Sequence, residues 1–244
     1  MKSWITFWNI LVKDMRNYYL KPPNISWGLV FPVAWTLMFF LKSQTPVNVR
    51  ELLPGVMSLS ILFGTTSVLA VTITFERRGR SFERLLLAPI DLNLLMLAKT
   101  SGAILFGLVN AFVPVLFASF LTHLSGIRWL PLLGAVFLIS VTSTLLGLFI
   151  AVSVKEVFEA QTFSNFFRFP MIFLCGLFIP VQGLPLFLRP LSYILPLTYG
   201  ADILKSSVNQ NGHLGLLVNF IILLCFAVVL FALTIRNVKR KWIY

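Results

Sequence analysis

The highest density of charged side chains in this sequence lies at residues 75–90, FERRGRSFERLLLAPI, between two apolar runs. Arginines and glutamates alternate there with Phe82, Leu85 and Leu86, which fall on one face of a helix. Pro89 would end such a helix. Apolar side chains on one face can enter a partner's groove while charged side chains form ion pairs at its rim. The chemistry predicted for this stretch is therefore docking, not catalysis.

Residue types that support catalysis or metal binding are sparse elsewhere in the chain. Two cysteines and two histidines show no metal-ligand spacing, and the motifs of serine hydrolases and metalloproteases are missing. The sequence contains no G-x-x-x-x-G-K-[ST] motif, so we expect no nucleotide to bind through a P-loop. These observations predict a chain that has no catalytic residues, no metal site and no cofactor of its own.

The composition indicates that the bilayer is the solvent of this chain. Of its 244 residues, 58% are hydrophobic and 11% are charged, whereas soluble domains carry about 25% charged residues. The net charge is +12, and the basic residues gather at the edges of apolar runs. That placement is typical of a membrane protein that sets its orientation, so we expect no nucleic-acid partner.

Six apolar runs are long enough to be membrane spans, which need about 20 residues each. They cover residues 25–41, 54–75, 99–121, 129–154, 163–179 and 214–235. Between the last two, residues 180–200 are rich in proline and glycine, which predicts short re-entrant or interfacial helices. The fold class expected is an all-α polytopic membrane protein with six transmembrane helices, in one domain of residues 25–244.

Residues 1–24 are expected to form a separate amphipathic helix that ends at Pro22 and Pro23. Trp4, Trp8 and Leu11 lie on its apolar face, opposite basic residues. This pattern favours a helix that lies in the membrane interface. The alternative is an ordinary helix that packs on the core of the protein.

Lysines and arginines are distributed unequally over the predicted loops. Fourteen fall on the side that includes both termini and residues 75–90, and five fall on the other side. The positive-inside rule therefore places both termini and residues 75–90 in the cytoplasm.

A few side chains inside the predicted spans are candidates for a transport pathway. Arg168 is a charge within the fifth span, where it either snorkels to the interface or faces the pathway. The second span is rich in hydroxyl groups, which let helices approach and hydrogen-bond in lipid. The fifth is rich in phenylalanines, which are more typical of packing or lipid contact than of a ligand surface. The candidate pathway residues are Thr65, Thr66, Arg168, Phe169 and Phe173.

Residues 75–90 carry a resemblance to a known family. Read as F-E-R-x-x-G-T-x-E-x-L-L-x-[AT]-P, the run resembles the cytoplasmic loop of type-2 ATP-binding-cassette (ABC) exporter permeases, the group of daunorubicin-resistance and lipooligosaccharide exporters. The residues that fit are Phe75, Glu76, Arg77, Glu83, Leu85, Leu86, Ala88 and Pro89. Ser81 replaces the common threonine, and Arg80 stands where the glycine is usual, with Gly79 one position earlier.

Features along the whole chain agree with this resemblance. The N-terminal helix is similar to the interfacial connecting helix of the family, and Pro32 is similar to a common proline of the first span. The segments 176–180, 184–185 and 196–199 resemble the region where short helices re-enter from outside. The resemblance implies external gate residues at Phe178, Pro180, Leu184 and Pro185.

What the resemblance implies is half of a transporter in a prokaryotic cytoplasmic membrane. Two copies of the chain would form the pathway, and two separate ABC ATPase subunits would hold ATP and Mg. A coupling helix within residues 76–90 would dock on the ATPase, with the turn at residues 155–159 as a second contact. The residues implied in coupling are Glu76, Arg77, Arg78, Gly79, Arg80, Ser81, Phe82, Glu83, Leu86 and Glu156.

The function implied is ATP-driven export of a lipophilic small molecule or drug. Export of a lipid-linked saccharide or polysaccharide by the same mechanism is an alternative within the family. A secondary carrier or channel is the alternative outside it, but such a protein usually has an acidic residue in the membrane core, and all eight carboxylates fall outside the predicted spans. A membrane-embedded enzyme would need acid–base groups that the spans lack.

Overall fold

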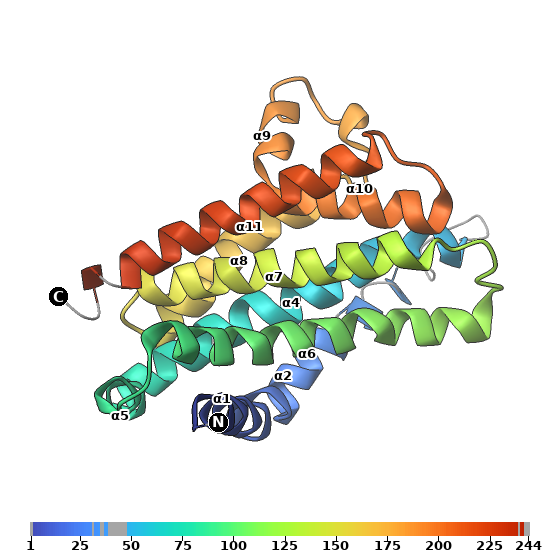
Figure 1. Ribbon diagram of the computed structural model, residues 1–244. Helices are drawn as coiled ribbons and strands as arrows, with labels where there is room; N and C mark the ends of the chain where they lie inside the picture. The colour runs from blue at the N-terminus through green and yellow to red at the C-terminus, as the bar shows by residue number, and fades with distance from the viewer. Residues whose placement is uncertain (1, 31, 35–36, 39–47, 239, 242–244) are drawn as a thin grey trace.

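A computed structural model describes residues 2–30, 32–34, 37–38, 48–238 and 240–241, and in these ranges the chain folds into helices without strands. Four long helices run side by side through the molecule (Figure 1). They are α4 (Val49–Arg78), α6 (Leu92–Leu121), α7 (Trp129–Ser153) and α11 (Leu216–Val238). Each is long and apolar enough to cross a membrane.

These four helices coincide with the second, third, fourth and sixth predicted spans. Of the first predicted span, residues 25–41, the structure describes residues 25–30, 32–34 and 37–38, which are helical, and the other six residues lie outside the described ones. The fifth falls on α8 (Val157–Leu174), which is not among the four candidate spans and ends at Leu174 rather than at residue 179. The helix stops there because Gly176 adopts a left-handed φ of 72°, which turns the chain out of the helical path.

Helix α4 is the centre of the bundle. Within its apolar segment, 94% of the residues are buried inside the protein. The helices that surround it are α6, α7, α8 and α10 (Pro196–Asn209). Glycines on two neighbours permit a close approach: a Cβ added at Gly107 would overlap the Thr65 side chain, and one added at Gly147 would overlap the carbonyl oxygen of Thr66. Small residues of this kind let membrane helices pack backbone against backbone.

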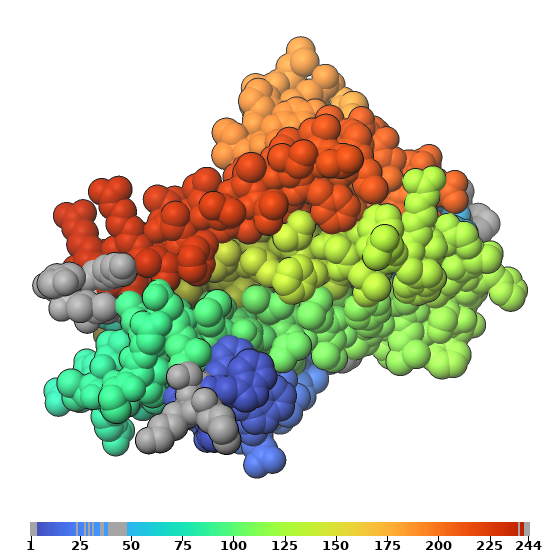
Figure 2. Space-filling model, viewed as in Figure 1, coloured from blue at the N-terminus to red at the C-terminus, as the bar shows by residue number. Residues whose placement is uncertain are grey.

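Residues 175–195 leave the bundle and return to it. They include the 3-10 turn η3 (Val181–Gly183) and the short helix α9 (Arg189–Ile194), and they stand out from the side of the molecule in Figures 1 and 2. The chain then packs back through α10 against α4, α7 and α11. Short helices therefore occur between α8 and α11, and their re-entrant or interfacial placement stays a prediction. Helix α10 continues to Asn209, beyond the expected limit near residue 200.

The N-terminal segment lies across one side of the bundle. Helix α1 (Lys2–Asp14) is seen end-on in Figure 1, whereas the long helices lie in the plane of the picture. It continues through η1 (Met15–Tyr19), α2 (Pro22–Ile25) and η2 (Ser26–Val30). Ile10 and Leu11 are buried, while Trp4 and Trp8 are exposed. The helix therefore packs on the protein with one face and offers a tryptophan-rich face outward.

Helix α5 (Ser81–Leu87) follows α4 through a tight turn at Gly79 and Arg80. In Figure 1 it lies at the same end of the bundle as α1 and the end of α11. We call this the α5 end.

The close contact at Gly147 makes a first prediction. The substitution Gly147→Ala forces α7 away from the backbone of α4 and should destabilise the protein by about 1–3 kcal/mol, the usual cost of overpacking. The measurement is thermal unfolding of the purified protein in detergent. Gly215→Ala is the control, because a Cβ there would meet nothing closer than 3.7 Å. Equal melting temperatures for the two variants would contradict the packing described for α4.

Candidate functional site

The turn between α4 and α5 depends on one residue with an unusual backbone conformation. Arg80 has a φ of 55° and ψ of 11°, in the left-handed region, and it is the N-cap of α5. Gly79, in contrast, has a φ of −79°, which any residue adopts. The family pattern expects its glycine at position 80, where the backbone is left-handed. A side chain there costs about 1–2 kcal/mol relative to right-handed backbone.

Helix α5 is held to the bundle by Phe82. Its ring is 1% exposed and belongs to a core cluster with Ile10, Tyr19, Ile73 and Leu95. Leu85 and Leu86 are partly buried against the same cluster. The prediction that Phe82 enters a groove of a partner does not fit this position, because the helical face that carries the apolar residues packs on the chain's own core. The outward face presents Glu83, Arg84 and Leu87.

A cluster of four charged side chains lies directly behind α5 at the contact of α1, α4 and α6. The Lys99 Nζ is 2.9 Å from Asp14 Oδ2 and 2.5 Å from Glu76 Oε2. The Lys13 Nζ is 2.9 Å from Glu76 Oε1 and 3.6 Å from Asp14 Oδ1. Side chains of Lys99, Asp14 and Glu76 are at most 2% exposed. We call these four residues the charge cluster.

The charge cluster is neutral as a whole, with two ammonium groups and two carboxylates. Burial raises the pKa of Asp14, against the attraction of Lys99. Burial acts to lower the pKa of Lys13, but its hydrogen bond and attraction to Glu76 outweigh this, so the pKa is raised. Loss of one partner from such a group leaves an uncompensated charge in a place without water.

The position of Glu76 corrects a prediction. The sequence suggested Glu76 as a rim residue that contacts an ATPase, but its side chain is buried within the charge cluster and cannot form an exposed ion pair. Lys13, Asp14 and Lys99 were not predicted as site residues. The available signal was a pair of charges, Lys13 and Asp14, at the end of an amphipathic helix that packs on the protein.

The two arginines that follow Glu76 connect α4 to its neighbours. Arg77 donates from Nη1 to the carbonyl oxygen of Val154 at 3.3 Å and to the carbonyl oxygen of Ala151 at 3.5 Å. It thereby gives a hydrogen-bond donor to carbonyl groups at the end of α7 that have no partner within the helix. Arg78 forms an exposed ion pair with Glu156 at 3.7 Å, just before α8. Ser81 donates to the carbonyl oxygen of Glu76 at 3.0 Å. Most of the predicted coupling residues therefore form a scaffold that positions α5.

A second exposed segment lies beside the end of α4. Glu156 and Glu159 form a capping box at the start of α8, in which Glu159 accepts from the backbone N–H groups of Lys155 and Glu156 at 2.9 and 3.2 Å. These backbone hydrogen bonds lower the pKa of Glu159. Phe158 in this turn is 81% exposed. Because Arg78 reaches Glu156, this turn and α5 belong to the same end of the molecule.

The structure does not bring the predicted pathway residues into one cavity. Thr65 and Thr66 are buried in the contacts of α4 with α6 and α7. Phe169 and Phe173 are about half exposed, at 49% and 52%, on α8. Arg168 is 2% exposed, so the alternative of snorkelling to the interface is wrong. Its guanidinium carbon lies 4.1 Å from the centre of the Phe63 ring, and Nη1 donates to Asn165 at 3.3 Å.

The predicted gate residues are divided between inside and outside. Leu184 is buried and Phe178 is partly buried, with its ring facing Gly55 of α4. Pro180 and Pro185 are exposed. Pro180 also lines a cavity of about 220 Å³ between the end of α8 and α10.

Comparison with known proteins relates this geometry to a family. The profile of the ABC-2 type transporter family matches residues 6–209, from within α1 to the end of α10. The inner membrane transport permease YadH of Escherichia coli K12 is 20% identical over 245 residues, which cover 97% of this chain and 96% of YadH. The probable multidrug ABC transporter permease YbhS of the same organism is 26% identical over 236 residues, which cover 95% of this chain and 56% of YbhS.

The charge cluster predicts a large effect from a single substitution. Lys99→Met keeps the side-chain length but leaves Asp14 and Glu76 buried with too little positive charge, and should destabilise the protein by about 3–5 kcal/mol. Unfolding of the purified protein measures the difference. Arg78→Met, which removes an exposed ion pair, should cost no more than about 1 kcal/mol. Adding Glu76→Gln to Lys99→Met should restore part of the loss, and its failure to do so would contradict the assignment.

The left-handed turn predicts a stabilising substitution. Arg80→Gly removes the strain of a side chain at φ 55° and should stabilise the protein by about 1 kcal/mol. Arg80→Ala removes the same guanidinium but keeps the strain, so it should give no gain. A comparable rise in melting temperature for both variants would assign the effect to the side chain instead of the backbone.

Proposed function

The chain belongs to the ABC-2 type transporter family, and we propose that it is the membrane half of an exporter driven by a separate ATPase that docks on α5. Membership implies a membrane subunit of an ABC transporter, in which another subunit is the ATPase. The apolar helices and the inner membrane relatives support a multi-pass protein of a bacterial inner membrane. In our proposal two copies form the pathway, and two ATPase subunits bind ATP and Mg.

The observation that carries the proposal is the way α5 is mounted. Its inner face is fixed by Phe82, while Glu83, Arg84 and Leu87 point outward, and Leu87 is 85% exposed. An apolar side chain flanked by charges at the tip of a rigid support is suited to a partner's groove. We propose Arg80, Glu83, Arg84 and Leu87 as the contact surface, with Phe158 as the second contact.

Movement of α5 would reach the bundle through several connections. Phe82 packs α5 against residues of α1 and α6. At the end of α4, which leads into α5, the charge cluster holds α1 and α6, Arg77 reaches the end of α7, and Arg78 reaches the start of α8. Packed helices with such contacts move as rigid elements, which is how a push at one end can change access at the other. In this proposal Glu76 and Arg77 are positioning residues and do not contact the ATPase directly.

The orientation we propose places the α5 end in the cytoplasm. The described ends of the chain and α5 lie at the same end of the bundle (Figure 1), in agreement with the excess of basic residues there. An ATPase that uses cytoplasmic ATP would dock at this end.

The cargo we propose is a lipophilic small molecule. YbhS is a probable multidrug permease, which favours this class, and a lipid-linked saccharide is the second candidate within the family. The exposed phenylalanines of α8 offer an apolar surface that two copies of the chain could share. ATPase activity stimulated by a panel of compounds, measured on the assembled complex, separates the two cargo classes.

Docking through α5 predicts the effect of a charge at its tip. Leu87→Asp should reduce co-purification with the partner ATPase, and cargo-stimulated ATP hydrolysis, by at least about tenfold, because a carboxylate cannot enter an apolar groove without desolvation. The melting temperature should not change, since Leu87 is exposed. Leu186→Asp is the control, because Leu186 is 78% exposed in the segment 175–195. Full coupling in the Leu87 variant, or export without ATP hydrolysis, would overturn the proposal.

A further inference from the structure

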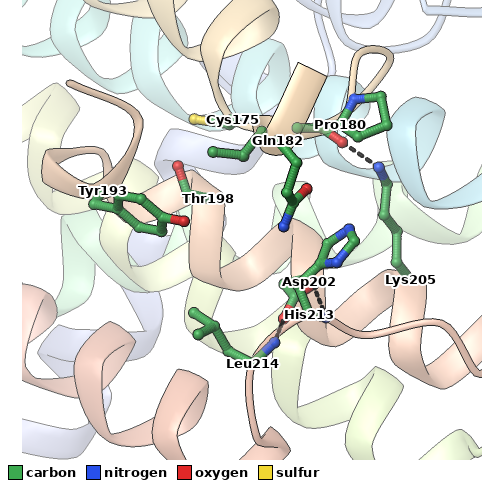
Figure 3. Close-up of a pocket in the computed structure, with 11 residues that line it drawn as sticks. Cys175, Pro180, Gln182, Tyr193, Thr198, Asp202, Lys205, His213 and Leu214 are labelled. Atoms are coloured by element: carbon green, nitrogen blue, oxygen red, sulfur yellow. Dashed lines mark hydrogen bonds between the residues drawn. The ribbon is translucent and has the colours of Figure 1, made fainter. Parts of the chain in front are cut away.

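A cavity of about 220 Å³ lies away from the α5 end, where four parts of the chain meet (Figure 3). They are the end of α8, residues 180–193, α10 and the turn before α11. Its polar lining residues are Gln182, Tyr193, Thr198, Asp202, Lys205 and His213. None of these residues takes part in the proposed docking of an ATPase, so a role of the cavity would be separate from docking.

The carboxylate of Asp202 accepts three hydrogen bonds from within the protein. It accepts from the backbone N–H of His213 at 2.9 Å, from that of Leu214 at 3.0 Å and from Asn219 Nδ2 at 2.7 Å. These hydrogen bonds fix the turn before α11 against α10. They also offset the negative charge, so Asp202 forms part of the wall and is not the group that receives a ligand.

Among the remaining polar groups of the cavity, Lys205 is a donor only, while Gln182, Tyr193 and a neutral His213 each offer a donor beside an acceptor. Lys205 contacts the carbonyl oxygen of Gly176 and keeps further N–H bonds, since an ammonium has three. Figure 3 shows Gln182 and His213 pointing toward each other from opposite sides, with Lys205 beside them and the Tyr193 hydroxyl across the space. Gln182 and His213 are exposed, and Tyr193 is 45% exposed, so a ligand can reach them.

We propose that this cavity binds an anionic oxygen group, a phosphate or a carboxylate. Lys205 supplies the charge, and Gln182, Tyr193 and His213 supply neutral donors around it, an arrangement that satisfies several oxygens at once. Val181 and Leu214 add apolar lining that suits the chain of an amphiphile. The anion comes either from the head group of a bilayer lipid or from a free anion in solution.

The experiment uses the purified full chain in a maltoside detergent without phosphate. The probes are inorganic phosphate, dihexanoyl-phosphatidylglycerol and, as the neutral counterpart, dihexanoylglycerol, each titrated at constant ionic strength. We expect saturable binding of at least one phosphate probe and none of dihexanoylglycerol. Binding of the phosphatidylglycerol alone identifies a lipid head group as the source, and binding of inorganic phosphate identifies a free anion.

Variants test whether the donors named here hold the anion. Lys205→Met and His213→Ala should each weaken binding of the phosphate probe by at least about tenfold. His213 is exposed and its contact with Asp202 is through the backbone, so this variant should fold even if Lys205→Met does not. Arg128→Met and His123→Ala are the controls, because both residues are exposed and neither lines the cavity.

Three results would overturn the proposal. They are no binding of either phosphate probe, equal binding of dihexanoylglycerol, or unchanged affinity in the His213 and Lys205 variants. The assay contains no ATPase, so its failure would leave the docking role of α5 unaffected, and failure of docking would leave this site unaffected.

Discussion

Lys99 binds two carboxylates where water does not reach, and the α5 end of the molecule is organised around that contact. None of Lys99, Asp14 and Glu76 can be left alone in a medium of low dielectric, so α1, α4 and α6 have to stay together. The position of α1 across the bundle and the burial of Phe82 both depend on this meeting point. Hydrophobic packing alone would permit the amphipathic helix to slide along the bundle, whereas paired charges fix its register.

Other basic side chains close the ends of helices. Arg77 reaches the last carbonyls of α7, Arg50 donates to the carbonyl oxygen of Val208 at 3.0 Å near the end of α10, and Lys205 contacts Gly176 beyond α8. Arg189 donates to the carbonyl oxygen of Leu184 at 3.0 Å. Carbonyls at a helix end need donors wherever water is scarce. A part of the net charge of +12 therefore stabilises helix ends as well as setting orientation.

Hydropathy was sufficient to predict α4, α6, α7 and α11, because a segment that is apolar over some 20 residues has few other structures available in a bilayer. It was not sufficient for α8, whose end is set by the backbone of Gly176. The roles within residues 75–90 were harder to predict. Glutamate and phenylalanine are also residue types of an exposed docking surface, so the sequence of this run could not show that Glu76 and Phe82 are buried. Glu76 is buried because Lys13 and Lys99, from distant parts of the sequence, pair with it. Phe82 is buried because Ile10 and Leu95 pack in the same cluster. The family pattern, in contrast, marked position 80 correctly as a place for glycine.

The enclosure of α4 has a consequence for how the protein is made. A chain emerges from the ribosome from its N-terminus, so α4 reaches the membrane ahead of α6 and α7. Yet of the four long helices it has the lowest mean hydropathy, 1.9 against 3.1 for α11, and the greatest buried share. Three of its hydroxyl groups need no neighbouring helix as a hydrogen-bond partner. Ser58, Thr65 and Thr74 each donate at 2.8 Å to a carbonyl oxygen four residues earlier in the same helix. These hydroxyl groups can therefore keep their hydrogen bonds in lipid before α6 and α7 pack around α4.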